Sequence, residues 1–87
     1  MKISGNKINY KHVRLTWWDI CQSEEAWIHE DDVLKHDIAI CTDTGYIFKK
    51  TKTKLWLFTS FSEDKDGLSV GGLTCFPIGC VKKIEYL

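Results

Sequence analysis

A short stretch in which apolar and polar side chains alternate, ending in two adjacent tryptophans, constrains the fold most. Residues 11–18 place Val13, Leu15 and Trp17 at every second position. Side chains of a strand alternate between its two faces, so this spacing predicts a β-strand that buries Trp17 in a core. Trp18 must then point to the opposite face. The other outward side chains of this strand are His12, Arg14 and Thr16.

Further segments of the chain have the composition of strands. We expect them over residues 37–42, 44–50, 54–61, 70–76 and 81–86, where 44–50 is either a separate strand or the continuation of 37–42 past a bend. A surface loop is expected at 62–67 and a 3₁₀ turn at 77–80. Residues 54–61 are apolar on both faces over much of their length, which predicts a strand that is central in its sheet or covered on two sides. Gly45 interrupts one strand pattern and indicates a bulge.

Residues 19–36 break the alternation and predict a long connection with one or two helical turns. Ser23 and the two glutamates after it resemble a helix start. We expect Trp27 and Ile28 to pin this connection to the rest of the domain. The fold class predicted is mainly β, a small five-stranded SH3-like or Sm-like barrel with a long first loop. A split β-sheet with one packed helix is the alternative.

The chain has 87 residues, which predicts a single domain: an N-terminal extension at 1–10 and the barrel at 11–87. A domain of this size buries only about 60 to 65% of its unfolded surface. Aromatic residues make up 13% of the chain, more than one small interior can hold. We therefore expect several rings to lie at a binding surface or in the interface of a homo-oligomer.

Positive and negative charges balance, and the net charge is zero. This argues against non-specific nucleic-acid binding. The charges are segregated, however, into an acidic stretch with a single lysine, Lys35, and a later lysine cluster. They are either two solvated faces, with the lysines protecting a sheet edge, or ends that dock a partner of opposite sign. The acidic stretch contains Asp19, Glu24, Glu25, Glu30, Asp31, Asp32 and Asp37, and the lysine cluster contains Lys49, Lys50, Lys52 and Lys54.

No segment resembles a signal peptide or a membrane span, so we expect the protein in the host cytoplasm, without a membrane partner. Its cysteines should then be reduced and act as small buried hydrophobes. Their spacing matches no metal-binding pattern, and we expect neither a metal site nor a cofactor. The cysteines are Cys21, Cys41, Cys75 and Cys80.

Five short motifs resemble those of small β-barrel proteins encoded in phage and prophage genomes. That family carries W-x-D-A, S-x-x-x-W, C-x-S-V-G-[YW]-[LI], L-A-x-S-x-S and I-P-x-G-C-[IV], in this order. The counterparts are Trp17-Trp18-Asp19-Ile20, Ser23 to Trp27, Cys41-Thr42-Asp43-Thr44-Gly45-Tyr46-Ile47, Leu57-Phe58-Thr59-Ser60-Phe61-Ser62 and Phe76-Pro77-Ile78-Gly79-Cys80-Val81. The chain departs from the pattern at Ile20, Asp43, Thr44, Phe58 and Phe76.

The resemblance covers residues 13–87 and implies a small viral β-barrel without enzymatic activity. It supplies no catalytic or binding residues. Accessory genes of phages often encode counter-defence proteins, which either occupy a host protein or sequester a nucleotide signal.

The residues themselves favour binding over catalysis. His36 precedes Asp37, and His29 precedes Glu30, but neither pair belongs to a recognised catalytic arrangement. We therefore predict no catalytic residues. An arginine with an aromatic ring, by contrast, suits a phosphate and a stacked base. The predicted ligand or partner residues are His12, Arg14, Trp18, Trp27, Tyr46, Lys54 and Trp56.

Two binding hypotheses follow. In the first, a homo-oligomer binds a small nucleotide at its subunit interfaces, with Arg14, Trp18 and Lys54 as ligands, and so acts as a nucleotide sponge. In the second, the acidic loop at 19–37 blocks a host protein, with Glu24, Glu25, Glu30, Asp31 and Asp32 facing that partner. A virion component and a small hydrolase are further alternatives. The covering of Trp18 stays open between the long loop, another subunit and a ligand.

Overall fold

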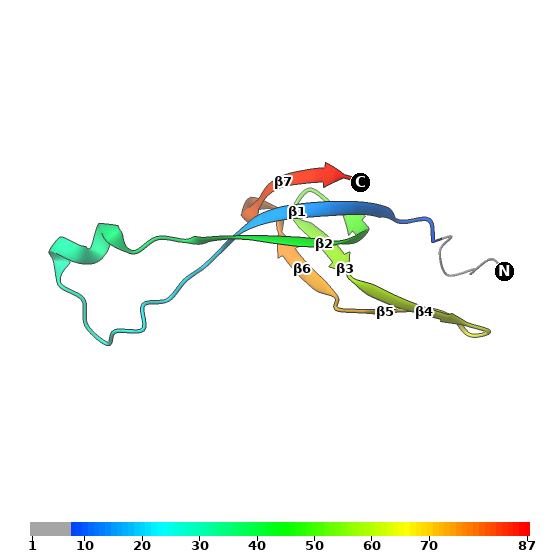
Figure 1. Ribbon diagram of the computed structural model, residues 1–87, viewed down its shortest axis with the longest axis horizontal. Helices are drawn as coiled ribbons and strands as arrows, with labels where there is room; N and C mark the ends of the chain where they lie inside the picture. Colours follow the sequence, from blue (N-terminus) through cyan, green and yellow to red (C-terminus); the bar gives the residue numbers. More distant parts are fainter. Residues whose placement is uncertain (1–7) are drawn as a thin grey trace.

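A computed structural model describes residues 8–87, and nearly every element in it is a strand (Figure 1). Residues 1–7 of the predicted N-terminal extension lie outside the described residues. In chain order the elements are β1 (Lys11–Asp19), η2 (Glu30–Lys35), β2 (Ala39–Lys50), β3 (Lys54–Phe58), β4 (Ser60–Asp64), β5 (Gly67–Gly71), β6 (Thr74–Pro77), η3 (Ile78–Cys80) and β7 (Val81–Tyr86), where η denotes a 3₁₀ helix.

Five of the strands form one antiparallel sheet in the order β6-β3-β2-β1-β7, and β4 pairs with β5 in a separate hairpin. The prediction of a mainly β fold is confirmed. The predicted closed barrel is not, because β6 and β7 are the two edges of the large sheet and do not pair with each other. The sheet is therefore open, with one face on the core and part of the other uncovered.

As predicted from the alternation, the apolar side chains of β1 face the core. Val13 and Leu15 are fully buried and pack with a core from β3 and β6. The Trp17 ring meets the Phe76 ring edge-on at 5.1 Å. Its indole Nε1 donates a hydrogen bond of 2.8 Å to Asp43 Oδ2, a side chain on the neighbouring strand β2. The remaining buried members of this core are Leu55, Leu57 and Phe76.

The role of Gly45 differs from the expected bulge. Strand β2 continues through Gly45 without a break, and the register shift lies further along, between Ile47 and Lys49. A Cβ atom at Gly45 would lie 2.6 Å from the carbonyl oxygen of Phe58, closer than packed atoms approach. The glycine therefore allows the backbones of β2 and β3 to meet where their strands pair.

The prediction of one strand over 54–61 and a loop over 62–67 was wrong. Strand β3 ends at Phe58, and the chain then forms the β4–β5 hairpin. The expected strand over 70–76 is likewise divided, because Gly72 adopts a left-handed φ of 63° between β5 and β6. The 3₁₀ turn predicted at 77–80 is confirmed as η3.

The long connection is an arm that extends away from the sheet (Figure 1). We call residues 20–38 the arm. Its helical turn is present as η2, but the helix start expected at Ser23 is not: Ser23 Oγ only accepts a 3.2 Å hydrogen bond from the Glu25 backbone N–H. Trp27 does not pin the arm to the sheet, since 90% of its surface is exposed. The radius of gyration of 17.5 Å reflects the arm, because a compact chain of this length would have about 12 Å.

We expect Asp43→Ala to lower the free energy of unfolding by about 1 to 3 kcal/mol, because the substitution leaves the half-buried Trp17 indole without its charged acceptor. The matched control is Thr44→Ala, which lies next to Asp43 on the exposed face and should change stability by less than about 0.5 kcal/mol. Urea unfolding followed by tryptophan fluorescence measures both. Equal losses for the two variants would contradict the assigned role of Asp43.

Candidate binding surface

The uncovered face of the sheet carries a polar patch over β7, β1 and β2. The strand register places Arg14 between Thr44 on β2 and Glu85 on β7. In the same way Thr16 lies between Thr42 and Lys83. We call the following side chains the outer patch: Arg14, Thr16, Trp18, Thr42, Thr44, Lys83 and Glu85.

Two cations in the outer patch share one carboxylate. Arg14 Nη1 is 3.7 Å from one oxygen of Glu85, and Lys83 Nζ is 3.8 Å from the other. Both contacts are long and solvent-exposed, and surface ion pairs of this kind contribute only about 0 to 1 kcal/mol. The guanidinium and ammonium groups therefore keep donors for an incoming anion.

Aromatic rings lie at both ends of the outer patch. Trp18 is 39% exposed and lies opposite Ile40 of β2. At the other end the His12 ring stacks on Tyr46 with centroids 4.7 Å apart. A strand rises about 3.3 Å per residue, so Trp18 and His12 are roughly 20 Å apart. Between these rings the surface offers hydroxyl groups and cations.

Tyr46, which stacks on His12, also belongs to a second cluster of aromatic rings. Its ring stacks on Phe58 at 5.4 Å and meets Phe61 edge-on at 5.9 Å. Tyr10 lies against Phe58 and stacks on Phe48 at 5.2 Å. Phe58 is fully buried although it lies on the face opposite the main core. This confirms that the β3 segment is covered on two sides.

Beside this cluster lies a groove of about 420 Å³ lined by Phe48, Lys49, Trp56, Val70 and Leu73. We call it the groove. Its walls come from β2, β3, β5 and the β5–β6 connection, and its lining is apolar apart from Lys49. Ligand pockets occupy about 300 to 1,000 Å³, so the groove can hold a small molecule or a large side chain.

The seven predicted binding residues lie in four places. His12, Arg14 and Trp18 share the uncovered face as predicted, with Tyr46 beside His12. Trp56 lines the groove. Lys54 begins β3, which β2 separates from β1, so it is not brought to Arg14. Trp27 lies on the arm.

Sequence reasoning missed Lys83, Thr42 and Thr44 as neighbours of Arg14. The local sequence does not predict this proximity, because the pairing of β1 with β2 and β7 brings these residues next to Arg14 and Thr16. It also missed Phe48 and Leu73 in the groove. Both side chains are about half exposed, and Leu73 directly follows Gly72, whose left-handed backbone separates β5 from β6.

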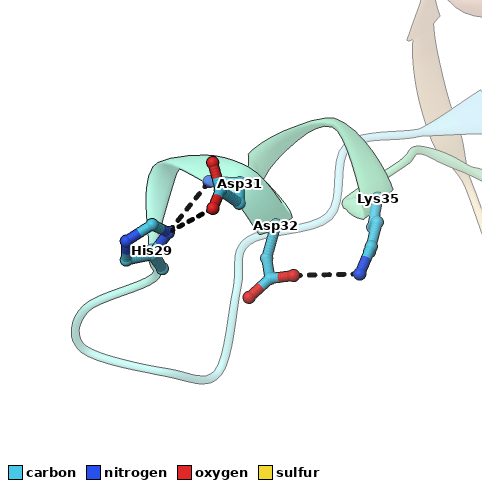
Figure 2. A network of polar contacts seen from close by, with 4 residues as sticks. All are labelled: His29, Asp31, Asp32 and Lys35. Carbon is cyan, nitrogen blue, oxygen red and sulfur yellow. Dashed lines mark hydrogen bonds and ion pairs between the residues drawn. The ribbon is translucent and has the colours of Figure 1, made fainter.

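The arm is ordered by local polar contacts (Figure 2). His29 caps η2, and its Nδ1 accepts a 3.1 Å hydrogen bond from the backbone N–H of Asp31. Lys35 Nζ donates to Asp32 Oδ1 at 3.0 Å. His36 Nε2 lies 2.7 Å from the carbonyl oxygen of Cys21 and so links the two sides of the arm. The side chains of Asp31 and Asp32 remain exposed beside these contacts.

The four cysteines are free thiols, and none of them is fully buried, in contrast to the expectation from sequence. Burial, with the carboxylates of Asp19 and Asp43 nearby, raises the pKa of the Cys41 thiol above its ordinary value. Over residues 8–87, no group of three or more His, Cys, Asp or Glu side chains is placed to hold a metal ion. Within the same part of the chain, no helix has the length and apolar character needed to cross a bilayer.

No protein-family model, curated protein or solved structure matches this chain.

The two adjacent tryptophans should differ in their effect on stability. Trp17→Ala removes a ring packed on the core and leaves Asp43 without its donor, so we expect a loss of about 3 to 5 kcal/mol. Trp18→Ala removes a partly exposed ring on the open face, and we expect a loss of about 1 to 2 kcal/mol. Thermal unfolding followed by circular dichroism tests the order, and a larger loss for Trp18→Ala would reverse the assignment of faces.

Proposed function

We propose that this chain is a non-enzymatic binding protein that works as a homo-oligomer and sequesters a small nucleotide on its outer patch. The observation that carries the proposal is the pair of weakly engaged cations, Arg14 and Lys83, on the same sheet face as the partly exposed ring of Trp18. Guanidinium and ammonium groups bind phosphate, and an exposed ring stacks on a base.

The geometry of the outer patch supports this assignment further. On β2, Thr44 lies opposite Arg14 and Thr42 lies opposite Thr16, so their hydroxyl groups can hydrogen-bond to a sugar or a phosphate. Rings at both ends of the patch suit a ligand with two bases or a base and a second flat group. Glu85 lies between the cations, and a phosphate would replace it as their partner.

The biological setting follows from the resemblance to phage and prophage proteins. We propose a counter-defence role in the host cytoplasm, in which bound nucleotide signal no longer reaches its receptor. We also propose that the open sheet is a variant of the SH3-like or Sm-like barrel. Two features support this: β1 lies between β2 and the last strand, and a 3₁₀ turn precedes that last strand.

Isothermal titration of the protein with cyclic dinucleotides and linear mononucleotides tests the proposal. We expect Trp18→Ala to weaken binding of a responding nucleotide about 5- to 150-fold through lost stacking. Arg14→Gln should weaken it at least about tenfold, because it removes a charge-assisted contact to phosphate. Lys65→Gln is the matched control, since it removes a lysine from the turn between β4 and β5.

Absence of heat with every nucleotide tested would overturn the proposal. So would binding that is equally weakened by Lys65→Gln and by Arg14→Gln, since that result would indicate a general charge effect.

A second candidate function is inhibition of a host protein by the arm. The exposure of Trp27 and of Leu34, at 90% and 95%, favours it, because soluble domains rarely leave such side chains uncovered together. Pull-down from host extract, repeated with the charge reversals Glu30→Lys, Asp31→Lys and Asp32→Lys, tests this candidate. We expect a specific partner to be lost with these reversals, and retention of the partner would count against the arm.

A further inference from the structure

The arm carries the largest set of uncovered apolar side chains in residues 8–87. Trp27 and Leu34 are almost fully exposed, and four others on the arm are at least partly so: Ile20, Ile28, Val33 and Ile38. Burying a Leu or a larger apolar side chain stabilises an assembly by about 1.5 to 3 kcal/mol. A partner that covers these side chains would therefore stabilise the arm.

The charge of the arm limits the kind of partner. Three consecutive acidic residues, Glu30, Asp31 and Asp32, form the first turn of η2, and Glu24 and Glu25 precede it. Lys35 already pairs with Asp32. A complementary surface must therefore combine an apolar hollow with several cations.

The groove and the turn next to it provide that combination within the same chain. Phe48, Trp56 and Leu73 form apolar walls, and Lys49 lies among them. Of the other lysines of the cluster, Lys50 ends β2, Lys52 lies in the turn and Lys54 begins β3.

The lysine-bearing turn is held in one shape before any partner arrives. Thr51 Oγ1 accepts hydrogen bonds from the backbone N–H groups of Thr53 and Lys54, at 3.3 and 3.0 Å. The Thr53 carbonyl oxygen accepts a further bond of 2.9 Å from the Ile78 backbone N–H. A fixed turn reduces the entropy that docking costs.

The arm and the groove of one chain lie at opposite ends of β2. Ala39, at the base of the arm, and Lys49, in the groove, are roughly 30 Å apart at about 3.3 Å per residue. The arm also extends away from the sheet (Figure 1). It is therefore placed to reach the groove of a neighbour.

We propose that the arm of one copy docks in the groove of a second copy, with Trp27 as the anchor in the groove and the η2 carboxylates on the lysine cluster. The exchange is reciprocal, so two identical arm-to-groove contacts form a twofold symmetric dimer. A large aromatic ring in a pocket surrounded by complementary charge is a common energetic centre of an interface. This inference rests on the homo-oligomer of the proposed function and names the surfaces that meet.

Mass measurement in solution with two charge-reversed variants tests the docking. The arm variant is Glu30→Lys, Asp31→Lys and Asp32→Lys, and the turn variant is Lys49→Glu, Lys50→Glu and Lys52→Glu. We expect wild-type protein to be a dimer and each variant alone to be a monomer, since arm and groove then carry like charges. An equimolar mixture of the two variants should restore the dimer, because both contacts regain opposite charges.

Two further variants separate docking from folding. Trp27→Ala alters a side chain that is 90% exposed in the single chain. It should leave the unfolding transition of dilute, monomeric protein unchanged and raise the dimer dissociation constant at least about tenfold. The control, Lys65→Glu with Asp66→Lys at the β4–β5 turn, should leave the dimer intact. A monomeric wild-type protein, or a dimer that persists in both charge-reversed variants, would overturn the inference.

The same samples distinguish this inference from the nucleotide proposal. Nucleotide binding by a wild-type protein that stays monomeric would refute the arm exchange and leave the outer patch supported. A dimer that is lost in each charge-reversed variant and restored in their mixture, but that binds no nucleotide, would refute the nucleotide proposal and leave the arm exchange supported.

Discussion

The pairing of β1 with β2 is the constraint on which the rest of this structure depends. It runs in register along all of β1, from Lys11 opposite Ile47 to Asp19 opposite Ala39. Because side chains alternate along both strands, this one register determines which residues line the core and which lie on the open face. A slip by one residue would bury Arg14 and expose Val13. The observed register places Trp17 and Asp43 on the same face of the sheet, where their side chains form a hydrogen bond. We infer that this bond stabilises the observed register over a register shifted by one residue.

The small size of the domain explains why its apolar residues occupy three separate regions. The main core holds five buried side chains from β1, β3 and β6. A second cluster covers Phe58 with the rings of Tyr10 and Tyr46. The arm holds a third set, whose side chains are exposed. An open sheet of this length cannot enclose all of these side chains, and the surplus is placed where a ligand or a second chain can cover it.

The sequence alone predicts the parts of this fold that follow from local pattern. Alternation identified the strand at 11–18 and assigned Trp17 and Trp18 to opposite faces, and composition identified η3. The same pattern could not show that the sheet stays open, that Gly72 divides two strands or that residues 20–38 leave the domain. Those features depend on distant contacts, such as the approach of Gly45 to the Phe58 carbonyl oxygen. For the outer patch, β1 supplied Arg14 and Trp18, whereas Lys83 arrives through tertiary pairing alone.

An open sheet leaves two edge strands with unpaired backbone N–H and C=O groups. Strands of other chains can pair with such edges, and this pairing leads to aggregation. Strand β6 has only four residues and ends in Pro77, which has no N–H to offer to an added strand. Strand β7 carries the consecutive residues Lys82 and Lys83, one on each face, and the desolvation of two ammonium groups opposes addition of another strand. Lys83 therefore has a second task besides its place in the outer patch. The lack of barrel closure makes solubility, and not only stability, a property that these edge residues must maintain.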